Sequence, residues 1–102
     1  MKVFIRPLAV LDMERSVSYI WEESPNSAAN FYDACRKTFE FLERNPHIGP
    51  KYPVSNKKLL GIRFFPVIGF KKYLVFYFPQ KIRIEIVRLL HTARDISGVI
   101  GG

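Results

Sequence analysis

The period of the hydrophobic residues changes once along the chain, and this change limits its fold more than any other feature. Up to about residue 45, apolar side chains recur every three to four positions, as in an amphipathic helix. From about residue 61 they alternate with polar ones, as in a strand with one buried face. In the segment KIRIEIVRLL this alternation predicts that Ile82, Ile84 and Ile86 share one side, opposite to the charged residues between them. Helices are therefore expected first and strands after them.

Two consecutive helices are predicted before the change of period. The first begins at Pro7, because proline is tolerated in the first helical turn, and the second follows Ser24, which can cap it, and ends before Pro46. The apolar positions of the first helix are Val10, Met13, Val17, Ile20 and Trp21. Those of the second are Ala28, Phe31, Cys35, Thr38 and Leu42. Since almost no linker separates the helices, they are expected to form an antiparallel hairpin.

One loop and four strands account for the rest of the sequence. The segment NPHIGPKYPVSNKK holds three prolines and three lysines and fits neither period, so an exposed loop is expected there. Gly69 marks one turn between late strands, and Pro79 with Gln80 marks another. The predicted strands are residues 3–7, 61–67, 71–78 and 81–90. The last three should pair as an antiparallel meander, and the first should be a short edge strand.

These elements predict a two-layered α+β fold, and the length of 102 residues fits a single domain over residues 1–102. The sequence contains no internal repeat. The helix pair is expected to cover one face of the sheet. The other face, from which lysine and arginine side chains would project, is expected to stay open to a ligand or a partner.

Positive charge is concentrated in the second half of the chain. Residues 1–50 carry 6 Lys or Arg against 7 Asp or Glu, whereas residues 51–102 carry 10 against 2, a net charge of +8. Such a surface attracts phosphate backbones or acidic protein segments, unless it serves only to keep the protein in solution. The residues expected to bind a target, crowded on one surface, are Lys57, Lys58, Arg63, Lys71, Lys72, Arg88, His91 and Arg94.

The sequence lacks the residue patterns of common metal and nucleotide sites. One cysteine and two distant histidines give no zinc-ligand spacing, and there is no phosphate-binding glycine loop or nucleophile elbow, so no metal or cofactor is expected. Cys35 cannot form an internal disulfide and is expected to pack in the core, which indicates a reducing compartment. Without a secretory signal or an apolar stretch that could cross a bilayer, the protein is expected to be cytoplasmic and to have no membrane contact.

The segment IVRLLHTARD ends a predicted strand with several polar residues. Alternation would bury Arg88, so either a bulge redirects the strand or the guanidinium is paired, with Asp95 as one candidate partner. The bulge is the favoured interpretation. His91 either ends the strand through a structural hydrogen bond or contacts the target. Arg94 and Asp95 are expected to form a local pair that holds the tail.

The order of the elements and five sequence phrases resemble the RelE/ParE toxin superfamily of type II toxin-antitoxin systems. The phrases are PLAVLDMERSVSYI, SPNSAANFY, NPHIG, GIRFFPVIGFKKYLVFYF and RLLHTARD, which together span nearly the whole chain. Thr92 replaces a glycine that is common in the last phrase, which affects only the local turn. The resemblance implies one fold with two activities. RelE-like members cut translated messenger RNA at the ribosome, and ParE-like members poison DNA gyrase.

The resemblance favours the ParE-like branch. In the RelE-like alternative, Arg63 and Arg88 would contact the scissile phosphate and His91 would exchange a proton, but the tail TARDISGVIGG lacks the terminal aromatic residue of that branch. No catalytic residue is therefore assigned, and whether the protein is an enzyme depends on the branch. The implied partners are DNA gyrase and a cognate antitoxin in a plasmid-stabilisation module, or the ribosome and messenger RNA in the alternative. A non-toxic nucleic-acid-binding module is a third hypothesis, because the fold alone does not determine function.

Overall fold

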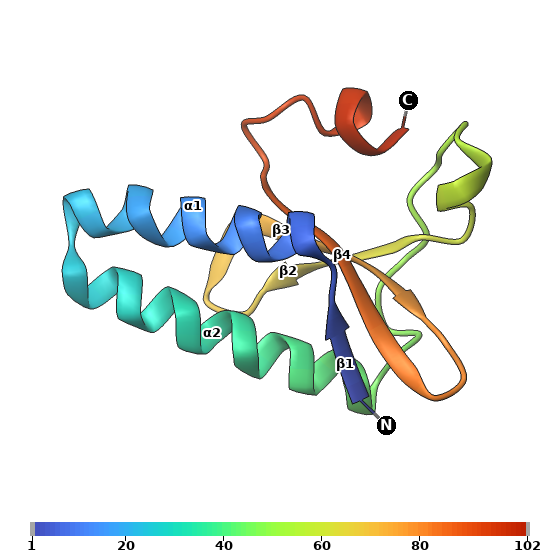
Figure 1. The fold of residues 1–102 in the computed structure, drawn as a ribbon, viewed down its shortest axis with the longest axis horizontal. Coiled ribbons are helices and arrows are strands. Elements are labelled where there is room, and N and C mark those ends of the chain that lie inside the picture. Colours follow the sequence, from blue (N-terminus) through green and yellow to red (C-terminus); the bar gives the residue numbers. More distant parts are fainter. Residues whose placement is uncertain (1, 102) are drawn as a thin grey trace.

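The computed structural model describes residues 2–101, which form two long helices and a four-stranded sheet (Figure 1). The elements are β1 (Lys2–Ile5), α1 (Pro7–Glu23), α2 (Pro25–Arg44), β2 (Arg63–Val67), β3 (Phe70–Pro79) and β4 (Arg83–His91). In the sheet order β1-β4-β3-β2, the last three strands form the predicted antiparallel meander, and β1 lies at the edge, parallel to β4. Both helices lie on the same side of the sheet, so the predicted α+β class is confirmed.

Ser24 ends α1 and begins α2, as the sequence predicts. Its backbone N–H donates to the Ile20 carbonyl at 2.9 Å, and its Oγ accepts a hydrogen bond from the Ser27 N–H at 3.2 Å. Pro25 occupies the first turn of α2, where a missing N–H leaves no helical hydrogen bond unmade. A single residue therefore joins the two antiparallel helices.

The two helices differ in how much of their surface they bury. All five predicted apolar positions of α2 are buried. In α1, Val10 and Trp21 are 40% and 57% exposed, so their assignment to the core is wrong. Val10 directly follows Ala9, and Trp21 directly follows Ile20, so each is rotated by about 100° around the helix from a residue that packs on the core. The residues of α1 that pack on the core are Ala9, Met13, Val17 and Ile20.

The main core lies between the helices and the sheet. Phe31 of α2 packs against Tyr73 of β3 with ring centroids 4.7 Å apart. Cys35 is fully buried beside them, and this burial raises the pKa of its thiol to about 12, so the thiol stays protonated. The predicted packing role of Cys35 is confirmed.

A bulge interrupts the pairing of β4 with β3. The register pairs Phe76 with Arg88 but Tyr77 with Ile86, which leaves Val87 as an extra residue. Because of this insertion, Ile86 and Leu89 both face the helices. In a regular strand, residues three positions apart would face opposite sides. The predicted bulge is confirmed.

Two residues near the start of β4 depart from the predicted alternation. Ile82 precedes the strand in the hairpin turn and is 78% exposed, so its assignment to the core face with Ile84 and Ile86 is wrong. Glu85 was expected on an open charged face, but it is only 6% exposed. Ion pairs with Arg6 and Arg83 compensate for the burial of this carboxylate.

The second face of the sheet is not open, contrary to the prediction. Phe76, Val87 and Leu90 point to this face and are buried beneath Ile62 and Ile100. The loop after α2 and the C-terminal turn η2 (Ser97–Gly101) supply this cover. Since both faces of β3 and β4 are apolar, both must be shielded from water, as in strands at the centre of a layered domain.

Tyr77 and Arg63 hold the loop that covers this face. The Tyr77 hydroxyl donates to the Pro46 carbonyl at 2.9 Å and accepts from the Gly49 N–H at 3.0 Å. Nη1 of Arg63 donates to the Gly49 carbonyl at 2.6 Å. A Cβ atom at position 49 would collide with the Phe64 carbonyl and the Tyr77 hydroxyl, so only glycine fits. The loop is therefore fixed to the sheet around Gly49, and most of its residues are exposed, as predicted.

A buried carboxylate joins α1 to the bulge of β4. Asp12 accepts hydrogen bonds from Nε and Nη2 of Arg88 at 2.7 and 3.0 Å and from the Leu89 N–H at 3.0 Å. The Leu89 amide needs this acceptor because β1 ends at Ile5 and no longer pairs with β4 at this level. The partner of Arg88 is thus Asp12, not Asp95. This hydrogen bond outweighs the effect of burial and raises the pKa of Arg88, which stays charged.

Replacing Tyr77 by phenylalanine is expected to lower the free energy of unfolding by about 1–3 kcal/mol, because it leaves the Pro46 carbonyl and the Gly49 N–H without partners. Urea denaturation measures this change. Tyr32→Phe is the matched control, since Tyr32 is exposed on α2. Equal midpoints for the two variants would show that the hydroxyl does not hold the loop.

Replacing Asp12 by alanine is expected to cost about 3–5 kcal/mol of unfolding free energy, because the substitution leaves a part-buried guanidinium and the Leu89 N–H without an acceptor. The control is Glu14→Ala on the exposed side of the same helix. Urea denaturation of both variants decides the outcome. A loss below about 1 kcal/mol for Asp12→Ala would mean that the pair contributes no more than a surface ion pair.

Candidate functional site

The end of β4 is closed by a hydrogen-bonded turn around His91. The Thr92 N–H donates to the Lys72 carbonyl at 2.7 Å, and the Ala93 N–H donates to Nδ1 of His91 at 2.9 Å. Because Nδ1 accepts this bond, Nε2 is the ring nitrogen that can donate a hydrogen bond to a ligand. The structural hydrogen bond expected of His91 is confirmed, and Nε2 makes no bond within residues 2–101.

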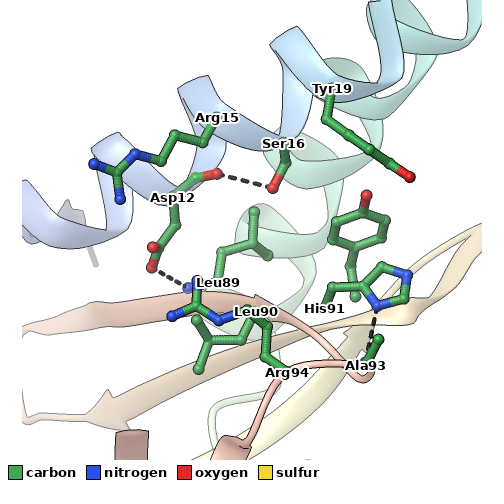
Figure 2. A pocket seen from close by; sticks show the side chains of 10 residues that line it. Asp12, Arg15, Ser16, Tyr19, Leu89, Leu90, His91, Ala93 and Arg94 are labelled. Atoms are coloured by element: carbon green, nitrogen blue, oxygen red, sulfur yellow. Dashed lines mark hydrogen bonds between the residues drawn. The ribbon is translucent and has the colours of Figure 1, made fainter. Parts of the chain in front are cut away.

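A pocket of about 470 Å³ lies between α1 and the end of β4 (Figure 2). This volume is in the range of small-ligand sites, which are about 300–1,000 Å³. The pocket is lined by Asp12, Arg15, Ser16, Tyr19, Tyr73, Leu89, Leu90, His91, Ala93 and Arg94. We call it the β4-end pocket.

Aromatic rings form one side of the β4-end pocket. The rings of Tyr73 and His91 meet at right angles with centroids 4.8 Å apart. Tyr19, which is 63% exposed, reaches from α1 towards the end of β4 where His91 lies (Figure 2). Burial raises the pKa of Tyr73, with smaller contributions from Tyr19 and Glu23, so its phenol stays neutral. This side therefore offers aromatic rings.

Two guanidiniums form the other side. Arg15 projects from α1 and Arg94 from the segment after β4, and both lie on the Asp12 side of the pocket, away from the Tyr19 and His91 rings (Figure 2). Neither arginine forms an ion pair or a side-chain hydrogen bond with any residue from 2 to 101. Asp12, which lines the same pocket, forms its ion pair with Arg88 and accepts three hydrogen bonds from the Arg88 side chain and the Leu89 amide.

The basic residues predicted to bind a target do not share one surface. Lys71 and Lys72 follow the β2–β3 turn and lie beside His91, to which the next residue, Tyr73, is paired (Figure 1). Lys57 and Lys58 lie in the short helix η1 (Lys57–Leu59), which precedes the opposite end of β2. The single cationic surface is therefore a wrong prediction, because the face that was to carry it is covered. Four of the predicted residues, Lys71, Lys72, His91 and Arg94, belong to the start of β3 and to the end of β4 with the turn that follows it, and these two strand ends are paired with each other.

Two predicted site arginines have internal partners instead. Arg63 donates from Nη1 to the carbonyls of Gly49 at 2.6 Å and His47 at 3.3 Å. Arg88 is fully engaged by Asp12, and only 19% of its side chain is exposed. The structure therefore does not join Arg63, Arg88 and His91 in one cluster, as the nuclease alternative requires.

The tail is held by Asp95 in a manner different from the prediction. Its Oδ1 accepts hydrogen bonds from Ser97 Oγ at 3.1 Å and from the Gly98 N–H at 3.0 Å, which caps η2. Within residues 2–101, Asp95 forms no ion pair with Arg94. The expected local pair is thus wrong, and Arg94 remains available to the pocket.

The charged and aromatic residues that α1 contributes to the β4-end pocket, Asp12, Arg15 and Tyr19, were not predicted as site residues. A signal for Asp12 exists, because a carboxylate stands on the apolar line of α1, next to Met13. Arg15 and Tyr19 are four positions apart, which places them on one side of a helix. That side was expected to face only solvent, since the sequence does not reveal where the end of β4 passes beneath α1.

No helix of the described chain is long and apolar enough to cross a membrane. Among residues 2–101 no three His, Cys, Asp or Glu side chains gather where they could hold a metal ion.

Comparisons with known proteins agree with this architecture. The family model described as "ParE toxin of type II toxin-antitoxin system, parDE" matches residues 3–96. No curated protein matches the sequence significantly. Among solved structures, a chain of the "Chromosomal ParDE TA system from P. aeruginosa" is similar in fold, with a TM-score of 0.69 and 15% identity over 89% of this chain and 95% of that one. The chain belongs to the ParE toxin family of type II toxin-antitoxin systems.

Proposed function

We propose that the protein is a toxin that inhibits DNA gyrase and is neutralised by a cognate antitoxin. The observation that carries this proposal is the family match, which extends over residues 3–96 and so includes both helices and the complete sheet. As a component of a toxin-antitoxin module, the protein would contribute to the stable maintenance of a plasmid. Action in the cytoplasm, where gyrase and its DNA are found, is part of the same proposal.

The internal hydrogen bonds of the strand arginines Arg63 and Arg88 favour this function over messenger RNA cleavage. A ribonuclease of the alternative type would need guanidiniums free to stabilise the charge at the scissile phosphate. Arg63 instead holds the loop through the Gly49 carbonyl, and Arg88 is paired with Asp12. Releasing either one would leave buried polar groups without partners. The geometry therefore supports a protein that acts by binding.

The cluster Lys71, Lys72, His91 and Arg94 is the surface that we assign to the target. The two lysines are exposed at the start of β3, and the backbone bond from Thr92 to Lys72 holds them next to the turn after β4. Positive charge at one end of a sheet speeds the encounter with DNA and with acidic protein surfaces. A complex of gyrase with DNA offers both.

An antitoxin partner is supported by the chain's exposed surface. A toxin-antitoxin system such as that of the structural neighbour pairs a toxin with an antitoxin. In this chain α1 exposes Leu8, Tyr19 and Trp21 by more than half. A flexible acidic segment that becomes ordered on binding could cover these apolar side chains and neutralise the net charge of +7. Such a partner would lie close to the target surface.

Gyrase inhibition is expected to depend on Lys71 and Lys72. The unmodified protein should block supercoiling of relaxed plasmid by gyrase and trap cleaved DNA, and Lys71→Glu with Lys72→Glu should raise the concentration for half-inhibition by about tenfold or more, because the sign of the surface charge is reversed. Gel electrophoresis of the plasmid measures both effects.

The matched control is the double variant Lys57→Glu and Lys58→Glu, which makes the same change of charge at the opposite end of β2. It should inhibit within about twofold of the unmodified protein, since exposed charges far from a contact are largely screened. Equal losses for the two pairs would contradict the assigned surface. If the unmodified protein neither inhibits gyrase nor traps cleaved DNA, the gyrase proposal itself fails, and new ends in translated transcripts would support the ribonuclease instead.

A further inference from the structure

The β4-end pocket has a division of chemistry that the family assignment does not explain. One side carries the rings of Tyr19 and His91, and the other carries the guanidiniums of Arg15 and Arg94 (Figure 2). Tyr73 packs against His91 on the first side. Leu89, which faces the helices, contributes an apolar floor between the two sides. A ligand that fits this pocket has a flat apolar part at one end and an anion at the other.

The cationic side is built to receive an anion from outside the fold. Arg15 and Arg94 have no acidic partner among residues 2–101, whereas arginines 6, 36, 83 and 88 are all paired. Asp12, the carboxylate that lines the same pocket, is already ion-paired with Arg88 and accepts a hydrogen bond from the Leu89 amide. Guanidiniums match phosphate oxygens with two parallel hydrogen bonds, which makes phosphate a better fit than a small halide or a single point charge.

The aromatic side is held in place and can support a flat ring. The bond from the Ala93 N–H fixes the His91 imidazole, and Tyr73 packs against it edge to face at 4.8 Å. Tyr19 is exposed, so one face of its ring is free to stack with a base. His91 Nε2–H adds a hydrogen-bond donor at this side.

We propose that the β4-end pocket binds a nucleotide, with its base against the rings of Tyr19 and His91 and its phosphate on Arg15 and Arg94. An aspartate or glutamate side chain of a protein segment would satisfy the guanidiniums alone and leave the aromatic side empty, so a nucleotide uses the pocket more completely. The volume of about 470 Å³ accommodates a ligand of this class. The nucleotide is either a free mononucleotide or the phosphorylated end of a single strand, which share this chemistry.

The site shares His91 and Arg94 with the surface assigned to gyrase above, but its test requires no gyrase.

Isothermal titration of the full chain with AMP, with inorganic phosphate and with a 5′-phosphorylated tetranucleotide measures the affinities directly. AMP is expected to bind at least about tenfold more tightly than phosphate, because stacking contributes in addition to the ionic contacts. A tetranucleotide that binds more tightly than AMP identifies a strand end as the source, and equal affinities identify the free nucleotide.

Three single variants separate the two sides of the pocket, and all three change exposed side chains, so the fold is retained. Arg15→Gln and Arg94→Gln should each lower the affinity for AMP and for phosphate by about tenfold. Tyr19→Leu should lower the affinity for AMP by about tenfold and leave the affinity for phosphate unchanged. Matched controls on α2 are Arg44→Gln and Tyr32→Leu, which should change neither affinity.

Failure of AMP to bind, or AMP binding no tighter than phosphate and unaffected by Tyr19→Leu, would overturn the proposal. The proposal is also overturned if AMP does not bind while a glutamate-rich peptide binds and loses about tenfold in affinity in Arg94→Gln. That result would assign the pocket to a protein segment. None of these results depends on whether the protein inhibits gyrase.

Discussion

The position of α1 on the sheet depends on the carboxylate of Asp12. Beyond Ile5 the edge strand leaves the sheet, so the next part of β4, which stays paired with β3 on one side, has no strand partner on the other. Asp12 supplies the missing acceptor for the Leu89 amide and at the same time neutralises the Arg88 guanidinium. About one and two turns later along α1, Arg15 and Tyr19 line the β4-end pocket, so the pocket depends on α1 being held at this place.

The bulge also explains where the positive charge can lie. It directs apolar residues of β4 to both faces of the sheet, and each face is then covered, one by the helices and the other by the loop and the tail. Cationic side chains are left at the rims, at η1 before β2 and at the end of β4. The charge of +8 in the second half of the chain is therefore divided among separate places rather than gathered on one surface, and the residues at the end of β4 adjoin the β4-end pocket.

The order of elements could be predicted from the sequence because local signals mark each boundary, such as Ser24 with Pro25 between the helices and Gly69 between the strands. The bulge could be predicted because Arg88 would otherwise be buried among isoleucines. The cover of the second face could not, since the loop that includes Gly49 has no hydrophobic period, and its attachment depends on a hydroxyl and a guanidinium from distant strands. The pocket likewise joins residues about 75 positions apart, and no local pattern relates them.

Amide hydrogen exchange at Leu89 tests the central role of Asp12 most directly. The Leu89 amide should exchange as slowly as the amides paired between β3 and β4, and in Asp12→Ala it should exchange at least about tenfold faster relative to those amides, because only its own acceptor is removed. Fast exchange in the unmodified protein, or an unchanged relative rate in Asp12→Ala, would show that the carboxylate does not hold the helix to the strand.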